Sequence, residues 1–165
     1  MQSDSLINRA ISNYADMVYR ILICHIGNKA DSDDAFQDVF VRLYRSNEEF
    51  ISDEHLKAYL IRISINIAND YHRRHFWKNK IELEDIYGTQ EIDNDDYGVM
   101  EAILSLPNKY RSVIYMFYYE EYKADEIAAI LHMKTNTVYS LLKRGREKLK
   151  ELLKGESDES IQEDA

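Results

Sequence analysis

Basic residues gather in two short segments of a sequence that is acidic overall. The formal net charge of the 165 residues is −9. Yet segment 134–150 carries six lysines and arginines against one glutamate, and segment 62–80 carries five against one aspartate. Clustered cations neutralise phosphates and release counterions, which supplies local affinity for a nucleic acid. A basic helix face that is only solvated has the same charge pattern. The spacing of the apolar residues between the cations is therefore needed to choose between the two interpretations.

The cations of segment 134–150 lie on a helix-turn-helix pattern. It runs through ADEIAAILHMKTNTVYSLLKRGREKL, with a turn of about three residues at 132–134 between two helices. The residues expected to face inward, from their spacing, are Ile127, Ala128 and Leu131 in the first helix and Val138, Leu142, Gly145 and Leu149 in the second.

The outer face of the second helix suits the major groove of DNA. Its early residues are short and polar, which suits base edges, and its later cations suit phosphates. This face carries Thr135, Asn136, Tyr139, Ser140, Lys143 and Arg144. A helix-turn-helix pattern alone is only moderately specific, because other helical hairpins share its periodicity.

The elements that must position these residues are expected to be helices throughout. The chain has only five glycines and one proline, and its apolar residues recur at spacings of three and four. A first helix in LINRAISNYADMVYRILICHI should end at Gly27, and Asp31 or Ser32 should cap the second. A third is expected in LKAYLIRISINIANDYHRRHFW. The fold class is therefore all-α.

A change in charge separates two small helical domains. Segment 81–101 holds eight acidic residues and no lysine or arginine, which indicates an acidic flexible linker. We therefore expect a helical domain at 1–80, the linker at 81–98, a helix-turn-helix domain at 99–155 and an acidic disordered tail at 156–165.

Other functions find little support in the sequence. The single cysteine, Cys24, provides no internal disulfide and no zinc-ligand set, and it is expected to be buried. The start of the chain lacks a signal peptide and no segment has the length of a membrane span, so we expect a cytoplasmic protein without membrane insertion. A helical metalloenzyme would rest on His72 and His75, spaced three apart, with only Asp70 nearby. We expect no enzyme, no metal and no cofactor.

Two long segments resemble a known family. LPNKYRSVIYMFYYEEYKADEIAAILHMKTNTVYSLLKRGREKLKELL resembles region four of bacterial RNA polymerase sigma factors of the extracytoplasmic-function group. DAFQDVFVRLYR followed by LKAYLIRISINIANDYHRR resembles region two, in the expected order. The resemblance implies a sigma factor that binds core RNA polymerase and promoter DNA, with an anti-sigma factor as a candidate partner. The alternative is a helix-turn-helix regulator that is not a sigma subunit.

The resemblance also implies three sets of contact residues. Those for core polymerase are Asp34, Gln37, Asp38, Phe40, Val41 and Leu43. Those for the promoter −10 element, including a loop that holds an extruded base, are Phe50, Leu56, Arg62, Asn66, Asn69, Arg73 and Arg74, while Tyr59 is expected in the core. For the −35 element, Lys134 and Arg146 join the outer face as phosphate contacts.

The helix-turn-helix departs from the family pattern at its turn and caps. His132 stands where a glycine is usual and must take a backbone conformation that is less comfortable for a side chain. Lys123 and Lys134 stand at positions where serine or threonine usually caps a helix. Since lysine cannot accept the free amide hydrogens, capping is expected to move to Asp125 and Thr135 or to be left to water.

Overall fold

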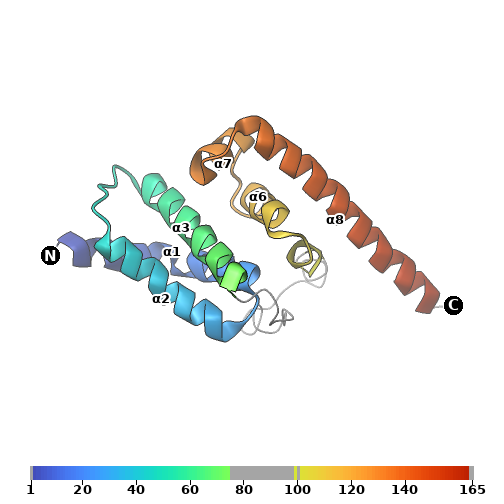
Figure 1. The fold of residues 1–165 in the computed structure, drawn as a ribbon, viewed down its shortest axis with the longest axis horizontal. Coiled ribbons are helices and arrows are strands. Elements are labelled where there is room, and N and C mark those ends of the chain that lie inside the picture. Colours follow the sequence, from blue (N-terminus) through green and yellow to red (C-terminus); the bar gives the residue numbers. More distant parts are fainter. Residues whose placement is uncertain (1, 75–98, 100, 164–165) are drawn as a thin grey trace. The chain divides into compact units, whose positions relative to one another are not determined.

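The structure, a computed structural model, describes residues 2–74, 99 and 101–163, and this part of the chain contains helices and no strand. The all-α prediction is confirmed. The chain divides into two compact units, Met1–Gly88 and Thr89–Ala165 (Figure 1). The division falls inside the expected linker 81–98, whose residues lie outside the described ones. Among the described residues, none of the helices is both long and apolar enough to cross a membrane.

The first unit is a bundle of three helices that all contact one another. It consists of α1 (Gln2–Ile26), α2 (Lys29–Arg45) and α3 (Asp53–Arg74) (Figure 1). Each helix contributes one apolar stripe to the shared core, as the spacing of three and four predicts. The fully buried residues include Val18, Ile21 and Leu22 of α1, Val39 and Leu43 of α2, and Leu60, Ile61 and Ile67 of α3.

A tight connection joins α1 to α2. Gly27 ends α1 with a φ of 88°, in the left-handed region that glycine adopts without cost, as predicted. The cap of α2 differs from the prediction. Asn28 accepts a hydrogen bond from the Asp31 backbone nitrogen at 2.9 Å, whereas the Ser32 hydroxyl donates to the Asn28 carbonyl. Asparagine is as good a cap as aspartate, so the helix starts earlier than the sequence suggested.

The second unit contains the helix-turn-helix. Helical residues 101–104 precede α6 (Asn108–Tyr118), α7 (Ala124–Leu131) and α8 (Thr135–Glu163), and α8 packs on both α6 and α7 (Figure 1). The helix α8 continues as far as Glu163, into the segment 156–165 for which the sequence predicts a disordered tail. No proline interrupts the sequence there, and adding residues to an existing helix costs far less than starting one.

A close contact fixes α8 against α6. A Cβ atom built on Gly145 would lie only 3.0 Å from Cγ1 of Ile114 and 3.4 Å from Cβ of Tyr110. Glycine inside a helix costs about 1 kcal/mol relative to alanine. Here the absent side chain lets the two backbones approach. The inward prediction for Gly145 is thereby confirmed, and the packing sets the direction in which α8 presents its opposite face.

Candidate nucleic-acid interface and docking face

The turn of the helix-turn-helix is built around a left-handed residue. The helix α7 ends at Leu131, His132 has φ 54° and ψ 45°, and α8 begins at Thr135. The His132 backbone N–H donates to the Ala128 carbonyl, which closes α7. This is the conformation that a C-terminal glycine usually supplies. The prediction that His132 must adopt a less comfortable backbone is confirmed.

The helix starts are capped differently from the prediction. At α7, the Lys123 backbone N–H donates to Oε2 of Glu126 at 2.8 Å, so Glu126 and not Asp125 satisfies the start of the helix. At α8, the Thr137 backbone nitrogen donates to the Lys134 carbonyl at 3.0 Å, and Thr135 is already the first helical residue. Lys134 therefore stays beside the positive end of α8, where its ammonium group is exposed.

The outer face of α8 is open to solvent, as predicted. Its inward residues Val138, Leu142 and Gly145 are buried, and Leu141 is buried beside them, so the packed stripe is wider than the sequence suggested. Thr135 is half-buried. The exposed residues of the predicted set are Lys134, Asn136, Tyr139, Ser140, Lys143, Arg144 and Arg146.

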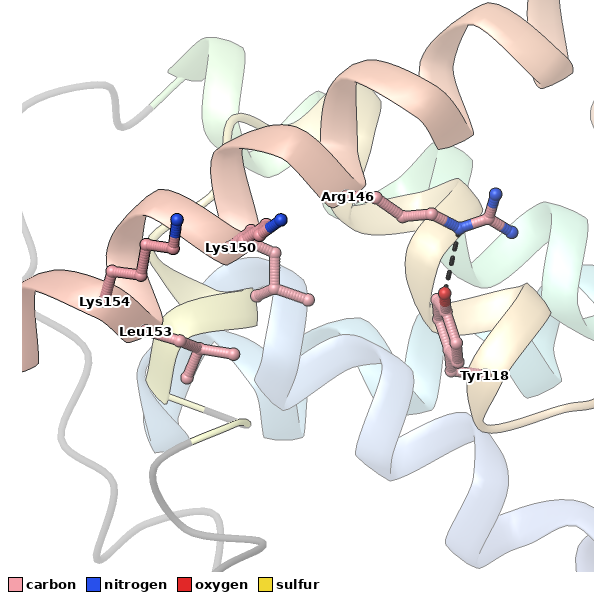
Figure 2. A pocket seen from close by; sticks show the side chains of 6 residues that line it. Tyr118, Arg146, Lys150, Leu153 and Lys154 are labelled. Carbon is pink, nitrogen blue, oxygen red and sulfur yellow. Dashed lines mark hydrogen bonds between the residues drawn. The ribbon is translucent and has the colours of Figure 1, made fainter. Parts of the chain in front are cut away.

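The side chain of Arg146 is held against the end of α6. Its Nε donates to the Tyr118 hydroxyl at 2.9 Å (Figure 2). Its guanidinium carbon lies 4.9 Å from the centre of the Phe117 ring. Both rings favour a cation at this place. Arg146 thus joins α8 to the end of α6 and also borders an open groove. The groove is lined by Tyr118, Arg146, Leu149, Lys150, Leu153 and Lys154 (Figure 2).

The residues implied for the −10 element lie on α3 and on the segment 46–52 that precedes it. Asn66, Arg73 and Arg74 are exposed, whereas Phe50, Arg62 and Asn69 are half-buried. Leu56 is fully buried, and its place in a loop that holds an extruded base stays a prediction. It lies in the first turn of α3, where the three-helix core excludes it from solvent.

A cluster of rings and opposite charges joins α3 to this segment. The Phe50 ring centre lies 5.2 Å from that of His55 and 5.1 Å from that of Tyr59. Arg62 places its guanidinium carbon 5.4 Å from the Tyr59 ring centre and its Nη2 3.8 Å from Oε1 of Glu48. Tyr59 is half-buried at the edge of this cluster and not inside the core as expected. Glu48 was not identified from the sequence.

The outer face of α2 carries most of the residues implied for polymerase binding. Asp34, Gln37, Asp38 and Val41 are exposed on it. Two residues of the predicted set are buried instead: Phe40 is 8% exposed and Leu43 is 1% exposed. They hold α2 on the bundle, and their contact with core polymerase stays a prediction.

Tyr44 extends this face and was missed in the sequence. Its side chain is 56% exposed, three residues beyond Val41 and seven beyond Gln37. Helical spacing places residues three, four and seven apart on one face, so this signal was present in the sequence. We call the exposed residues Asp34, Gln37, Asp38, Val41 and Tyr44 the α2 face.

Both units match one protein family. Sigma-70 region 2 matches residues 10–78, and Sigma-70 region 4 matches residues 98–149. The RNA polymerase sigma-E factor of Streptomyces antibioticus is 31% identical over 139 residues, which covers 78% of this chain and 73% of that protein. The chain belongs to the sigma-70 family.

Further relatives place this sigma factor in the extracytoplasmic-function group, and its role is in transcription initiation. The ECF RNA polymerase sigma factor SigW of Bacillus subtilis is 28% identical over 163 residues, covering 86% of this chain and 85% of that protein. Among solved structures, the sigma factor RpoE in complex with the anti-sigma factor NepR from Bartonella quintana has the same fold. Its TM-score is 0.68 at 21% identity, covering 89% of this chain and 96% of that one.

The carboxylates of α2 act on the pKa of a neighbouring tyrosine on α3. Burial raises the pKa of Tyr71 above its usual value, and the carboxylates of Asp38, Asp34 and Asp31 raise it further. The hydroxyl of Tyr71 therefore stays protonated at neutral pH. It is a neutral hydrogen-bond donor beside a row of negative charges. The exposed aspartates Asp34 and Asp38 give the α2 face of this sigma factor its negative charge.

A metal site finds no support in the described part of the sigma factor. No group of three or more histidine, cysteine or acidic residues there could hold a metal ion. The side chains of His72 and His75, on which the enzyme alternative rested, lie outside the described residues. Cys24 is buried in α1, as predicted.

The left-handed turn predicts an unusual response to glycine. We expect His132→Gly to raise the free energy of unfolding by about 0.5–1 kcal/mol, because a side chain in this conformation costs about 1–2 kcal/mol and glycine avoids it. Ala129→Gly, at an exposed site inside α7, is the matched control and should lower the free energy by about 1 kcal/mol. Urea denaturation measures both. Equal destabilisation by the two glycines would contradict the assigned turn.

Proposed function

We propose that this protein is the promoter-recognition subunit of RNA polymerase, and that it is not itself an enzyme. One observation carries the proposal. The two sigma-70 regions fall on separate helical units, and each unit exposes a face made of residues that the family resemblance assigns to polymerase or promoter.

Each of three exposed surfaces binds a different partner or promoter element in this proposal. The α2 face, negative and partly apolar, docks on core polymerase. The exposed polar and basic side chains of α3, with the ring cluster at Phe50, bind the opened −10 element, because rings stack on unpaired bases and cations bind their phosphates. The outer face of α8 enters the major groove of the −35 element, with Asn136 and Tyr139 near base edges and Lys143 and Arg144 near the backbone.

An anti-sigma factor is proposed as a further partner, and the cytoplasm as the place of action. Two solved proteins of the same fold support the partner. One is RpoE bound to the anti-sigma factor NepR, and the other is CnrH bound to the cytosolic domain of CnrY, with a TM-score of 0.69 at 22% identity to this chain.

Run-off transcription tests the proposed function. Purified protein is added to core RNA polymerase on fragments of the source genome, beginning upstream of its own gene. A sigma factor yields discrete transcripts that require both proteins. A helix-turn-helix regulator without sigma activity would bind DNA by itself, would not associate with core enzyme and would start no transcript, and this result would overturn the proposal.

Promoter opening is predicted to depend on the end of α3. Replacing Arg73 and Arg74 together by alanine should lower permanganate reactivity of −10 thymines about tenfold, because two exposed phosphate-binding cations are lost. Binding to core polymerase should persist, since the α2 face is unchanged. Arg20→Ala, at an exposed site on α1, is the control. Unaltered thymine reactivity in the double variant would show that this basic cluster is only a solvated face.

A further inference from the structure

The end of α6 and the middle of α8 are joined at the surface by the side chains of Tyr118 and Arg146. The hydrogen bond from Nε of Arg146 to the Tyr118 hydroxyl links residues that are 28 apart in the sequence (Figure 2). Both side chains are exposed, and Tyr118 is 50% open to solvent. A contact of this kind adds little burial to the core, but it fixes the direction of a long side chain.

The groups that hold the guanidinium group of Arg146 are neutral. Besides the hydroxyl, they are the rings of Phe117 and Tyr118, whose centres lie 4.9 and 5.8 Å from the guanidinium carbon. These two rings pack edge to face with their centres 5.1 Å apart, so each limits the movement of the other. A carboxylate in the same place would have cancelled the charge. A hydroxyl and two rings orient the guanidinium group and leave its charge for an anion.

The remaining donors of Arg146 suit a phosphate. A guanidinium group carries N–H donors on three nitrogens, and the bond to Tyr118 uses the donor on Nε. The donors on the two terminal nitrogens point from the end of the planar group, which can bind two oxygens of one phosphate at once. An arginine held on a ring can therefore bind a phosphate without leaving that ring.

Helical spacing places Arg146 on a side of α8 that is open to solvent. It lies three residues beyond Lys143 and seven beyond Tyr139, and both of these are exposed on the outer face. Lys150, four residues further on, is exposed as well. Arg146 thus lies at the border of the face that the proposed function places in the major groove, where the phosphates of the duplex line the groove.

We propose that Tyr118 is a positioning residue for promoter recognition, because its hydroxyl holds Arg146 in the orientation in which the terminal nitrogens bind one phosphate beside the −35 element. This inference rests on the proposed function, since it needs promoter DNA as the partner of α8. Tyr118 acts through Arg146 and does not itself bind the DNA. A long side chain loses rotamer freedom when it is immobilised on binding, and Tyr118 makes this loss smaller for Arg146.

The test uses full-length variants assembled with core polymerase and titrated on a labelled promoter fragment, found by the run-off experiment, at several salt concentrations. Tyr118→Phe removes the hydroxyl and keeps the ring. It is made alone, together with Arg146→Ala, and together with Arg144→Ala, which removes an exposed cation two residues earlier on α8. The Arg144→Ala background is the matched control. Circular dichroism checks that every variant is folded.

Tyr118→Phe should weaken promoter binding about threefold to fivefold and leave the slope of log affinity against log salt unchanged, because the number of phosphates bound stays the same. Arg146→Ala should weaken binding about tenfold and reduce the slope by about one. In the Arg146→Ala protein, Tyr118→Phe should have no further effect. In the Arg144→Ala protein it should weaken binding by the same factor as in the parent protein. This pattern supports the positioning role.

Other patterns overturn the inference. If Tyr118→Phe binds the promoter as tightly as the parent protein does, the hydroxyl does not prepare Arg146 for DNA. If Tyr118→Phe weakens binding equally in the Arg146→Ala protein, Tyr118 acts on the packing of α8 or binds DNA itself. If Arg146→Ala leaves affinity and salt slope unchanged while Arg144→Ala alters both, Arg146 only joins α8 to α6.

Failure of the proposed function gives a different result. In that case the parent holoenzyme shows no preference for the promoter over unrelated DNA, whatever residue stands at positions 118 and 146. Failure of the inference alone leaves this preference of the parent holoenzyme intact.

Discussion

Asp38→Arg is expected to lower the affinity of this protein for core RNA polymerase about 30-fold. Asp38 is exposed at the middle of the α2 face, between Asp34 and Val41. A negative face of this kind is matched by positive charge on its partner, so an arginine removes an attraction and adds a repulsion. A loss of about 2 kcal/mol corresponds to the stated factor. Pull-down of core enzyme and a titration by fluorescence anisotropy measure it.

The control for this prediction is Asp16→Arg, which makes the same charge change at an exposed site on α1. It should leave core binding within about twofold. Circular dichroism should show both variants folded, since neither side chain is part of the core. Unchanged core binding by a folded Asp38→Arg protein would show that the α2 face is not the docking surface.

The second large effect is expected on α8, where two substitutions should act differently. Asn136→Ala removes a candidate base contact, so it should cost about 1–3 kcal/mol at one promoter position and relax base preference there. Arg144→Ala removes a candidate phosphate contact. It should weaken binding to all sequences about equally and reduce the slope of log affinity against log salt by about one.

Both proteins are measured as holoenzymes on a set of promoters that differ by single bases in the −35 element, at several salt concentrations. The two variants serve as controls for each other, because both residues are exposed on one helix and neither belongs to the core. If neither substitution changes affinity, salt slope or base preference, then α8 is not the reading helix and its cations need another explanation.

Helical periodicity alone was enough to predict the elements of this protein. Its stripes at spacings of three and four identified α1, α2 and α3 and most inward residues of α7 and α8, because a helix with one apolar stripe can bury it only against another element. Of the residues predicted to face inward, Leu131 and Leu149 are only half-buried. The turn at His132 was also predictable. A helical pattern that stops and restarts within three residues requires one residue of special backbone conformation.

The assignment of single side chains to partner or core was less predictable. Phe40, Leu43 and Leu56 belong to motifs that the family resemblance assigns to contacts, yet all three are buried. Tyr59 was expected in the core and lies at its edge. A short motif indicates which segment lies near a surface. The way in which the three helices pack against one another determines which of its side chains point outward.

What the sequence by itself determined is the class of fold, the order of its helices and the two basic clusters, because these depend on residue type and local spacing. Only the tertiary structure decided that Arg146 is held by the rings of α6 and that Glu48 pairs with Arg62. The reason is physical. Each of these contacts joins residues on different elements, and their distance in space depends on how those elements pack and not on their separation along the chain.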